Sequence, residues 1–168
     1  TYYDFDGKGM PEGYQSAMTR QQWENMIRFV DTVGGKLLIS MANCEGLHHA
    51  EEPWNPSEAE KIFALSVELG HPIDAVEFTN EPNILQTTGF PVNYTAEHFR
   101  RDQDLFHKWV RENYPDTMIV GPCTIDAMNG GGDESGMSTA GVGAAFGVTT
   151  GQTGRAPQQE CRDRSRMP

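Results

Sequence analysis

The sequence predicts an α/β fold built on parallel strands, and three observations support this. Three amphipathic stripes with helical spacing each follow a capping signal. Three short strand-like runs alternate with these stripes and begin about 40 residues apart, which leaves room for helical crossovers. Both a doubly wound sheet and a (β/α)₈ barrel satisfy this pattern. The 168 residues are well short of the roughly 250 of a complete barrel, so a barrel would be partial, with about three βα units.

Each predicted helix has a start signal, an apolar face and an end signal. The predicted N-caps are Thr19, which forms a capping box with Gln22, Ser57, which forms one with Glu60, and Thr95. Glycine follows the first helix at 34–35 and the second at 70, and proline follows the third at 115. The apolar faces consist of Trp23, Met26, Ile27, Val30 and Val33; Ala59, Ile62, Phe63, Ser66 and Leu69; and Phe99, Phe106, Trp109 and Val110.

The predicted strands cover residues 36–43, 74–80 and 117–121. The first is almost continuously apolar, which is typical of a strand covered on both faces. Right-handed crossovers through the helices would place the three strands in one parallel sheet.

A change in composition divides the chain near residue 127. Residues 1–126 hold all three Trp and all five Tyr, whereas residues 127–168 contain no Leu or Ile and nine glycines. The second segment has too few large apolar side chains to offset the entropy lost on ordering. We therefore expect an α/β domain, either the partial barrel or a doubly wound sheet, over 1–126 and a Gly-rich tail over 127–168 that is disordered, artefactual or a linker.

Charge and cysteine content exclude several classes of protein. Thirteen Lys and Arg against 24 Asp and Glu give a net charge of −11, which argues against a nucleic-acid partner. No run approaches the roughly 18 apolar residues of a membrane span. Cys44, Cys123 and Cys161 form no CxxC motif, and we expect free thiols.

Polar residues follow the predicted strands, where ligand sites of parallel α/β folds are located. Asn43 ends the first strand, and Asn80, Glu81 and Pro82 end the second. Pro82 should bias Glu81 towards an extended backbone and so limit the freedom of its side chain. A carboxyl group presented in this way could donate a proton to a substrate in a cleft.

Five landmarks in order resemble glycoside hydrolase family 79, the heparanase-like and β-glucuronidase enzymes of clan A. They are the strand 38–43 (LISMAN), the helix start 54–57 (WNPS), the strand end 76–83 (VEFTNEPN), the helix segment 104–108 (DLFHK) and the strand end 120–122 (VGP). The resemblance covers roughly residues 19–125. It implies that the three strands correspond to the third, fourth and fifth of a (β/α)₈ barrel.

The resemblance also implies a chemistry, namely retaining hydrolysis of glucuronides or glycans that contain glucuronic acid, without a cofactor. Glu81 is similar to the family's general acid/base, and Asn80 to the residue that binds the sugar 2-hydroxyl. Asn43 would line the neighbouring subsite. The family's nucleophile, a Glu on the seventh strand, has no counterpart, because neither Glu134 nor Glu160 ends a plausible strand. We therefore expect a fragment that is inactive alone.

Simpler structural roles apply to other polar residues. Glu77 should point into the barrel interior as a structural hydrogen-bonding group. His48, His49, Glu51 and Glu52 could suggest a metal site. Adjacent histidines cannot easily share one metal, so we expect a solvated or glycan-facing loop instead.

Asn93 begins an N-glycosylation sequon, Asn-Tyr-Thr, before the third helix. Members of the resembled family usually reside in the secretory route or the lysosome. Together with the sequon, this favours a secretory, lysosomal or extracellular location, with membrane association only through glycans. Two other functions remain open. One is a different clan A glycosidase that acts on a neutral glycan, and the other is a non-catalytic glycan-binding or inactive homologue.

Overall fold

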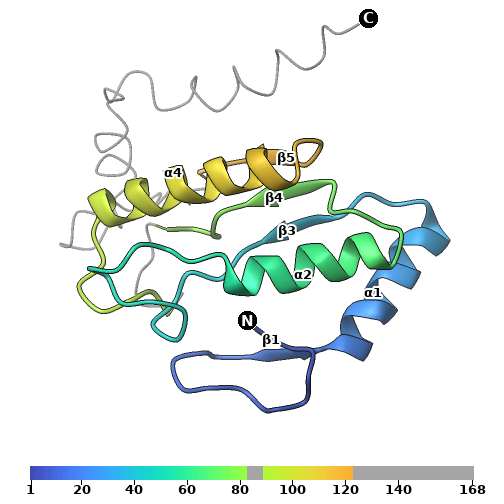
Figure 1. The fold of residues 1–168 in the computed structure, drawn as a ribbon, viewed down its shortest axis with the longest axis horizontal. Coiled ribbons are helices and arrows are strands. Elements are labelled where there is room, and N and C mark those ends of the chain that lie inside the picture. Colours follow the sequence, from blue (N-terminus) through green and yellow to red (C-terminus); the bar gives the residue numbers. More distant parts are fainter. Residues whose placement is uncertain (83–88, 123–168) are drawn as a thin grey trace, which may run out of the picture.

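A computed structural model describes residues 1–82 and 89–122 (Figure 1). The predicted tail over 127–168, Cys123 and Cys161 lie outside these residues. Within them, all strands pair in parallel, which confirms the predicted α/β class, but the strands do not close into a barrel.

The central sheet has the strand order β3-β4-β5, with β3 at Leu38–Ser40, β4 at Ala75–Glu77 and β5 at Met118–Val120. Ile39, Val76 and Ile119 are in register and face the helices. These strands lie inside the predicted ranges but are shorter. Two further strands, β1 (Tyr2–Asp4) and β2 (Ala17–Thr19), pair with each other and were not predicted. Three-residue strands are too short to show a period-2 pattern.

The helices are α1 (Arg20–Val33), α2 (Ser57–Glu68) and α4 (Ala96–Asn113). Thr19 and Thr95 are N-caps with complete capping boxes, as predicted for Thr19 with Gln22 and for the cap at Thr95. None of the described helices is both long and apolar enough to cross a membrane.

The prediction that Ser57 caps the second helix is wrong. Pro56 is the N-cap and makes no side-chain capping bond, and Ser57 is already helical. The Ser57 hydroxyl instead donates to Asn55 Oδ1 at 2.6 Å. Asn55 Oδ1 also accepts the Ser57 backbone N–H at 3.2 Å. The Asn55 side chain thus satisfies an N–H group at the start of α2 that has no acceptor within the helix.

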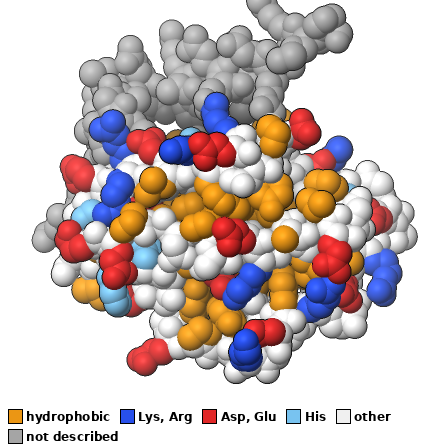
Figure 2. Space-filling view, in the orientation of Figure 1, with side chains coloured by type: hydrophobic (Ala, Val, Ile, Leu, Met, Phe, Trp, Pro, Cys, Tyr) orange, Lys and Arg blue, Asp and Glu red, His pale blue; other side chains and the backbone are white. Residues whose placement is uncertain are grey.

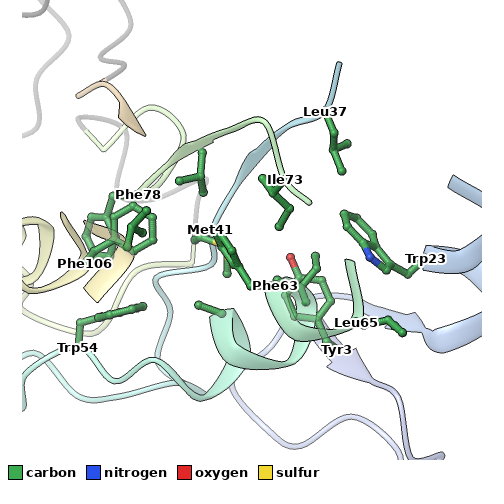
Figure 3. Packing of buried hydrophobic residues seen from close by; sticks show 14 of the residues in the cluster. Tyr3, Trp23, Leu37, Met41, Trp54, Phe63, Leu65, Ile73, Phe78 and Phe106 are labelled. Atoms are coloured by element: carbon green, nitrogen blue, oxygen red, sulfur yellow. The ribbon is translucent and has the colours of Figure 1, made fainter. Parts of the chain in front are cut away.

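Aromatic side chains join the helices to the sheet (Figure 3). The Trp54 ring packs edge-on against Phe78, which follows β4, and against Phe106 of α4, with centroids 6.0 and 5.4 Å apart. Phe63 of α2 contacts Trp109 of α4 at 5.3 Å. Figure 2 shows hydrophobic side chains across the middle of the face that α2 and α4 present, bordered by charged side chains.

Two glycines allow the N-terminal segment to lie against the loop after β3. Gly13 has a φ of +85°, and its carbonyl accepts the Gly46 N–H at 3.1 Å. A Cβ on Gly46 would lie 2.4 Å from the Tyr14 ring, so only glycine fits there. This contact fixes the N-terminal segment beside the carboxyl end of β3.

Candidate functional site

A pocket of about 180 Å³ lies where β3 and β4 end. The strand ends supply most of its lining, and the N-terminal segment supplies the rest. The residues that line it are Thr1, Gln15, Ser40, Met41, Ala42, Asn43, Cys44, Thr79 and Asn80. This is the edge at which parallel α/β folds place ligands.

The structure places Asn80 in the lining of this pocket, whereas Glu81, the next residue, is not among the lining residues. Asn80 is exposed and lines the pocket, and Glu81 is half-buried. Glu81 has a φ of +46°, so the prediction of an extended backbone is wrong. A positive φ is uncommon for any residue other than glycine. Proline favours an extended backbone at the residue before it. Here Pro82 is buried in a turn, and the turn sets the backbone of Glu81 instead.

Asn43 also lines the pocket, but its side chain is only 3% exposed, and both ends of its amide have partners. Nδ2 donates to the Tyr94 hydroxyl at 2.8 Å, and Oδ1 lies 2.7 Å from His48 Nε2. Each end keeps capacity for one more hydrogen bond, because an amide has two N–H groups and two oxygen lone pairs.

Tyr94 connects Asn43 to a buried carboxylate on α4. Its hydroxyl donates to Asp102 Oδ2 at 2.7 Å. Arg101 donates to both oxygens of Asp102, at 2.7 and 3.0 Å, and the Trp54 backbone N–H donates to Oδ1 at 3.0 Å. Burial, with the charge of Asp102 as the next cause, raises the pKa of Tyr94, so the phenol keeps its proton.

The histidines of the loop after β3 have different environments. His49, Glu51 and Glu52 are exposed, as expected for a solvated loop. The prediction is wrong for His48, whose side chain is 1% exposed and which contacts Asn43 and two backbone carbonyls. These partners lie within five residues of His48, but no apolar periodicity in the loop indicates that its ring is buried. The described residues contain no cluster of three or more His, Cys, Asp or Glu arranged to hold a metal.

Glu77 and Cys44 have structural environments. Glu77 is 6% exposed, points away from the helices and accepts a hydrogen bond from Ser40, in agreement with the predicted structural role. Cys44 is a free, buried thiol at the pocket, as expected, and burial raises its pKa. A thiol with a raised pKa is a poor nucleophile near neutral pH.

Asn93, the glycosylation candidate, is exposed and precedes the N-cap of α4 with a φ of +62°. The next residue, Tyr94, is 1% exposed. The asparagine of the sequon is thus accessible in the folded chain, while its tyrosine belongs to the core.

Neither Tyr94 nor Asp102 is predicted from the sequence as part of the site. For Asp102 a signal existed, because it follows Phe99 by three residues and precedes Phe106 by four, which places a carboxylate on an apolar helix face. Such a residue is buried only when it has partners. Tyr94 has no comparable local signal.

A family model described as "Glycosyl hydrolase family 79, N-terminal domain" matches residues 8–130. The match spans Asn43, Asn80 and Glu81 and all five resemblance landmarks. Among curated proteins, no match was found.

Proposed function

The chain belongs to glycosyl hydrolase family 79, and we propose that it supplies the acid/base half of a retaining glycosidase site. The observation that supports this proposal is the pocket at the ends of β3 and β4, with Asn80 in its wall and Glu81 next in the chain. The proposed domain consists of residues 1–126, with 127–168 as a separate tail.

In the proposed mechanism, Glu81 protonates the oxygen of the leaving group while a second carboxylate attacks the anomeric carbon. Glu81 then removes a proton from the water that releases the sugar. Retention requires the two carboxyl groups to lie roughly 5–5.5 Å apart. We propose that the second carboxylate comes from outside this chain, so the chain alone does not turn over substrate.

The proposed substrates are glucuronides or glycans that contain glucuronic acid. A volume of about 180 Å³ is below the range of about 300–1,000 Å³ typical of drug-sized ligands, so it suits one sugar unit. Asn80, which is exposed in the pocket, would bind the sugar 2-hydroxyl. Asn43 would line the neighbouring subsite through its remaining N–H and oxygen lone pair. With the exposed Asn93 sequon, we propose a secretory location.

Hydrolysis tests the role of Glu81. We expect the purified 168-residue chain to release no nitrophenol from 4-nitrophenyl β-D-glucuronide above the level of Glu81→Gln. In a chain extended to include the second carboxylate, E81Q should lower kcat by a factor of about 10²–10⁴, because the water that releases the sugar loses its general base. Glu60→Gln, an exposed carboxylate on α2, is the matched control. A kcat of the extended chain that E81Q leaves unchanged would contradict the role of Glu81. Turnover of the short chain that E81Q abolishes would contradict only its predicted inactivity.

Binding distinguishes the substrate classes. NMR titration of the chain with methyl β-D-glucuronide should shift signals of pocket residues, and Asn80→Ala should remove these shifts. Equal or stronger shifts with methyl β-D-glucoside would favour a glycosidase for neutral glycans. Binding without turnover in the extended chain would favour the non-catalytic alternative.

A further inference from the structure

The part of the pocket lining that does not come from the strand ends belongs to the N-terminal segment, and Gln15 is its amide-bearing residue. Gln15 is exposed, and its side chain makes no hydrogen bond to the part of the chain that the structure describes. A primary amide has two N–H donors and two oxygen lone pairs. Within the described chain, this hydrogen-bonding capacity is therefore available to a ligand in the pocket.

The residue before Gln15 is fixed by packing. The Tyr14 ring is 9% exposed and packs edge-on against the Tyr2 ring, with centroids 5.2 Å apart. On its other contact, the Tyr14 ring lies so close to Gly46 that a Cβ there would be 2.4 Å away. The backbone that enters Gln15 is thus tied both to β1 and to the loop after β3.

The residue after Gln15 is fixed by hydrogen bonds. The Ser16 carbonyl accepts the Tyr2 backbone N–H at 2.8 Å, next to the first pair of β1 and β2. The Ser16 hydroxyl also lies 3.1 Å from the hydroxyl of Thr1. Both chain neighbours of Gln15 therefore depend on the position of β1.

Two side chains of α2 hold β1 in turn. Glu58 Oε2 accepts the Tyr3 backbone N–H at 2.6 Å, and Lys61 Nζ donates to the Tyr3 carbonyl at 3.3 Å. Lys61 also binds Glu58 Oε1 at 2.6 Å and lies 4.2 Å from the centre of the Tyr2 ring. Glu58 is only 4% exposed. The two side chains thus satisfy both backbone groups of Tyr3, as a neighbouring strand would.

A further restraint acts on the Gln15 side chain itself. A Cβ on Gly89 would lie 2.7 Å from Gln15 Nε2 and 3.1 Å from Cδ, so the amide packs directly on the Gly89 backbone. Gly89 has a φ of +71° and precedes α4. The amide is therefore restrained by packing, while its hydrogen-bonding groups have no competing partner in the described chain.

We propose that Gln15 is a substrate-binding residue of the pocket and that Glu58 and Lys61 are its positioning residues. That the ligand is a sugar rests on the proposed function. Sugar hydroxyls both donate and accept, so two neighbouring hydroxyls suit an amide, and Asn80 supplies another exposed amide to the same lining. An amide restrained before the ligand arrives loses little entropy on binding it.

NMR titration of the 168-residue chain with methyl β-D-glucuronide tests the binding role. Gln15→Ala should raise Kd about 2–10-fold, because one or two hydrogen bonds to the ligand are lost. Gln21→Ala, at an exposed glutamine on α1, is the matched control and should leave Kd unchanged. An unchanged Kd in Q15A beside weaker binding in Asn80→Ala would overturn this inference and leave the proposed function standing. No binding by the unaltered chain would refute both.

A double-mutant cycle tests the positioning role. Glu58→Gln should raise Kd in the unaltered background, and this factor should fall to about one in Q15A, because the pair acts on the ligand only through Gln15. Glu60→Gln, the exposed acid on the same helix, should leave Kd unchanged in both backgrounds. Lys61→Met provides a second variant in case E58Q does not fold. An unchanged Kd, or an equal rise in both backgrounds, would contradict the positioning role.

Discussion

At the scale of single residues, Asp74 shows how one carboxylate ties two strands together. Its Oδ1 binds Lys36 Nζ at 2.7 Å, and its Oδ2 accepts the Leu37 backbone N–H at 2.8 Å, beside the first pairs of β3 and β4. Burial acts to raise the pKa of Asp74. The hydrogen bonds from Lys36 and Leu37 outweigh this effect, so its pKa is lowered.

We expect Asp74→Asn to destabilise the chain by about 1–2 kcal/mol at pH 7, because charge-assisted hydrogen bonds are lost. A carboxyl group whose folded-state pKa is lowered stabilises the fold above its unfolded pKa of about 3.9. It loses this contribution as the pH falls through the folded value. Urea unfolding between pH 7 and 3 should show that the unfolding free energies of the unaltered chain and of Asp74→Asn become equal at acid pH. A difference between these free energies that grows on acidification would contradict the prediction.

Tyr94 joins Asn43 to the buried Asp102 through its hydroxyl, so removing that hydroxyl should destabilise the fold. We expect Tyr94→Phe to lower the free energy of unfolding by about 1–3 kcal/mol, because a buried carboxylate loses a donor. Tyr114→Phe is the matched control, since that ring packs on Phe63 and Trp109 and is half-buried. Chemical denaturation of both variants would measure the difference, and equal losses would refute it.

At the scale of elements, local sequence signals located the helices more accurately than the strands. Thr19 and Thr95 cap their helices because their oxygens meet free N–H groups one turn ahead, a relationship contained within four residues. Ser57 satisfied the same motif. Pro56 occupies the cap position, and Asn55 Oδ1 accepts hydrogen bonds from the backbone N–H and the hydroxyl of Ser57.

Substitution to alanine should separate the two cases. Thr19→Ala and Thr95→Ala should each cost about 1 kcal/mol, the usual value of an N-cap. Ser57→Ala should cost under about 0.5 kcal/mol, as for most surface positions. Thermal unfolding monitored by circular dichroism would rank the three variants. A Ser57→Ala loss as large as that of Thr19→Ala would restore Ser57 as a cap.

At the scale of the whole molecule, the sheet face opposite the helices is partly exposed among the described residues. Leu38 and Met118 point away from the helices and are 55% and 42% exposed. β3 and β5 are the edge strands of this sheet. Open edges and exposed apolar side chains promote pairing with other chains.

We therefore expect the isolated chain to self-associate as its concentration rises. Leu38→Lys should reduce this association, because a charge on an edge strand disfavours pairing with another strand. Phe29→Lys is the control, since Phe29 is 66% exposed but lies on α1. Light scattering over a concentration series would compare the variants. A monomeric chain with a sharp cooperative melt would contradict the prediction.

The sequence by itself determined the helices, the parallel α/β class, the position of the pocket at the strand ends and the family. These features depend on short-range periodicity, caps and motifs such as 80–82, which are contained within a few residues. Tertiary structure decided the left-handed Glu81, the burial of His48 and the network from Asn43 through Tyr94 to Asp102. The reason is that Asn43 and Tyr94 lie 51 residues apart in the chain, and Tyr94 and Asp102 lie 8 residues apart. The burial that makes each hydrogen bond obligatory exists only once the helices have packed on the sheet.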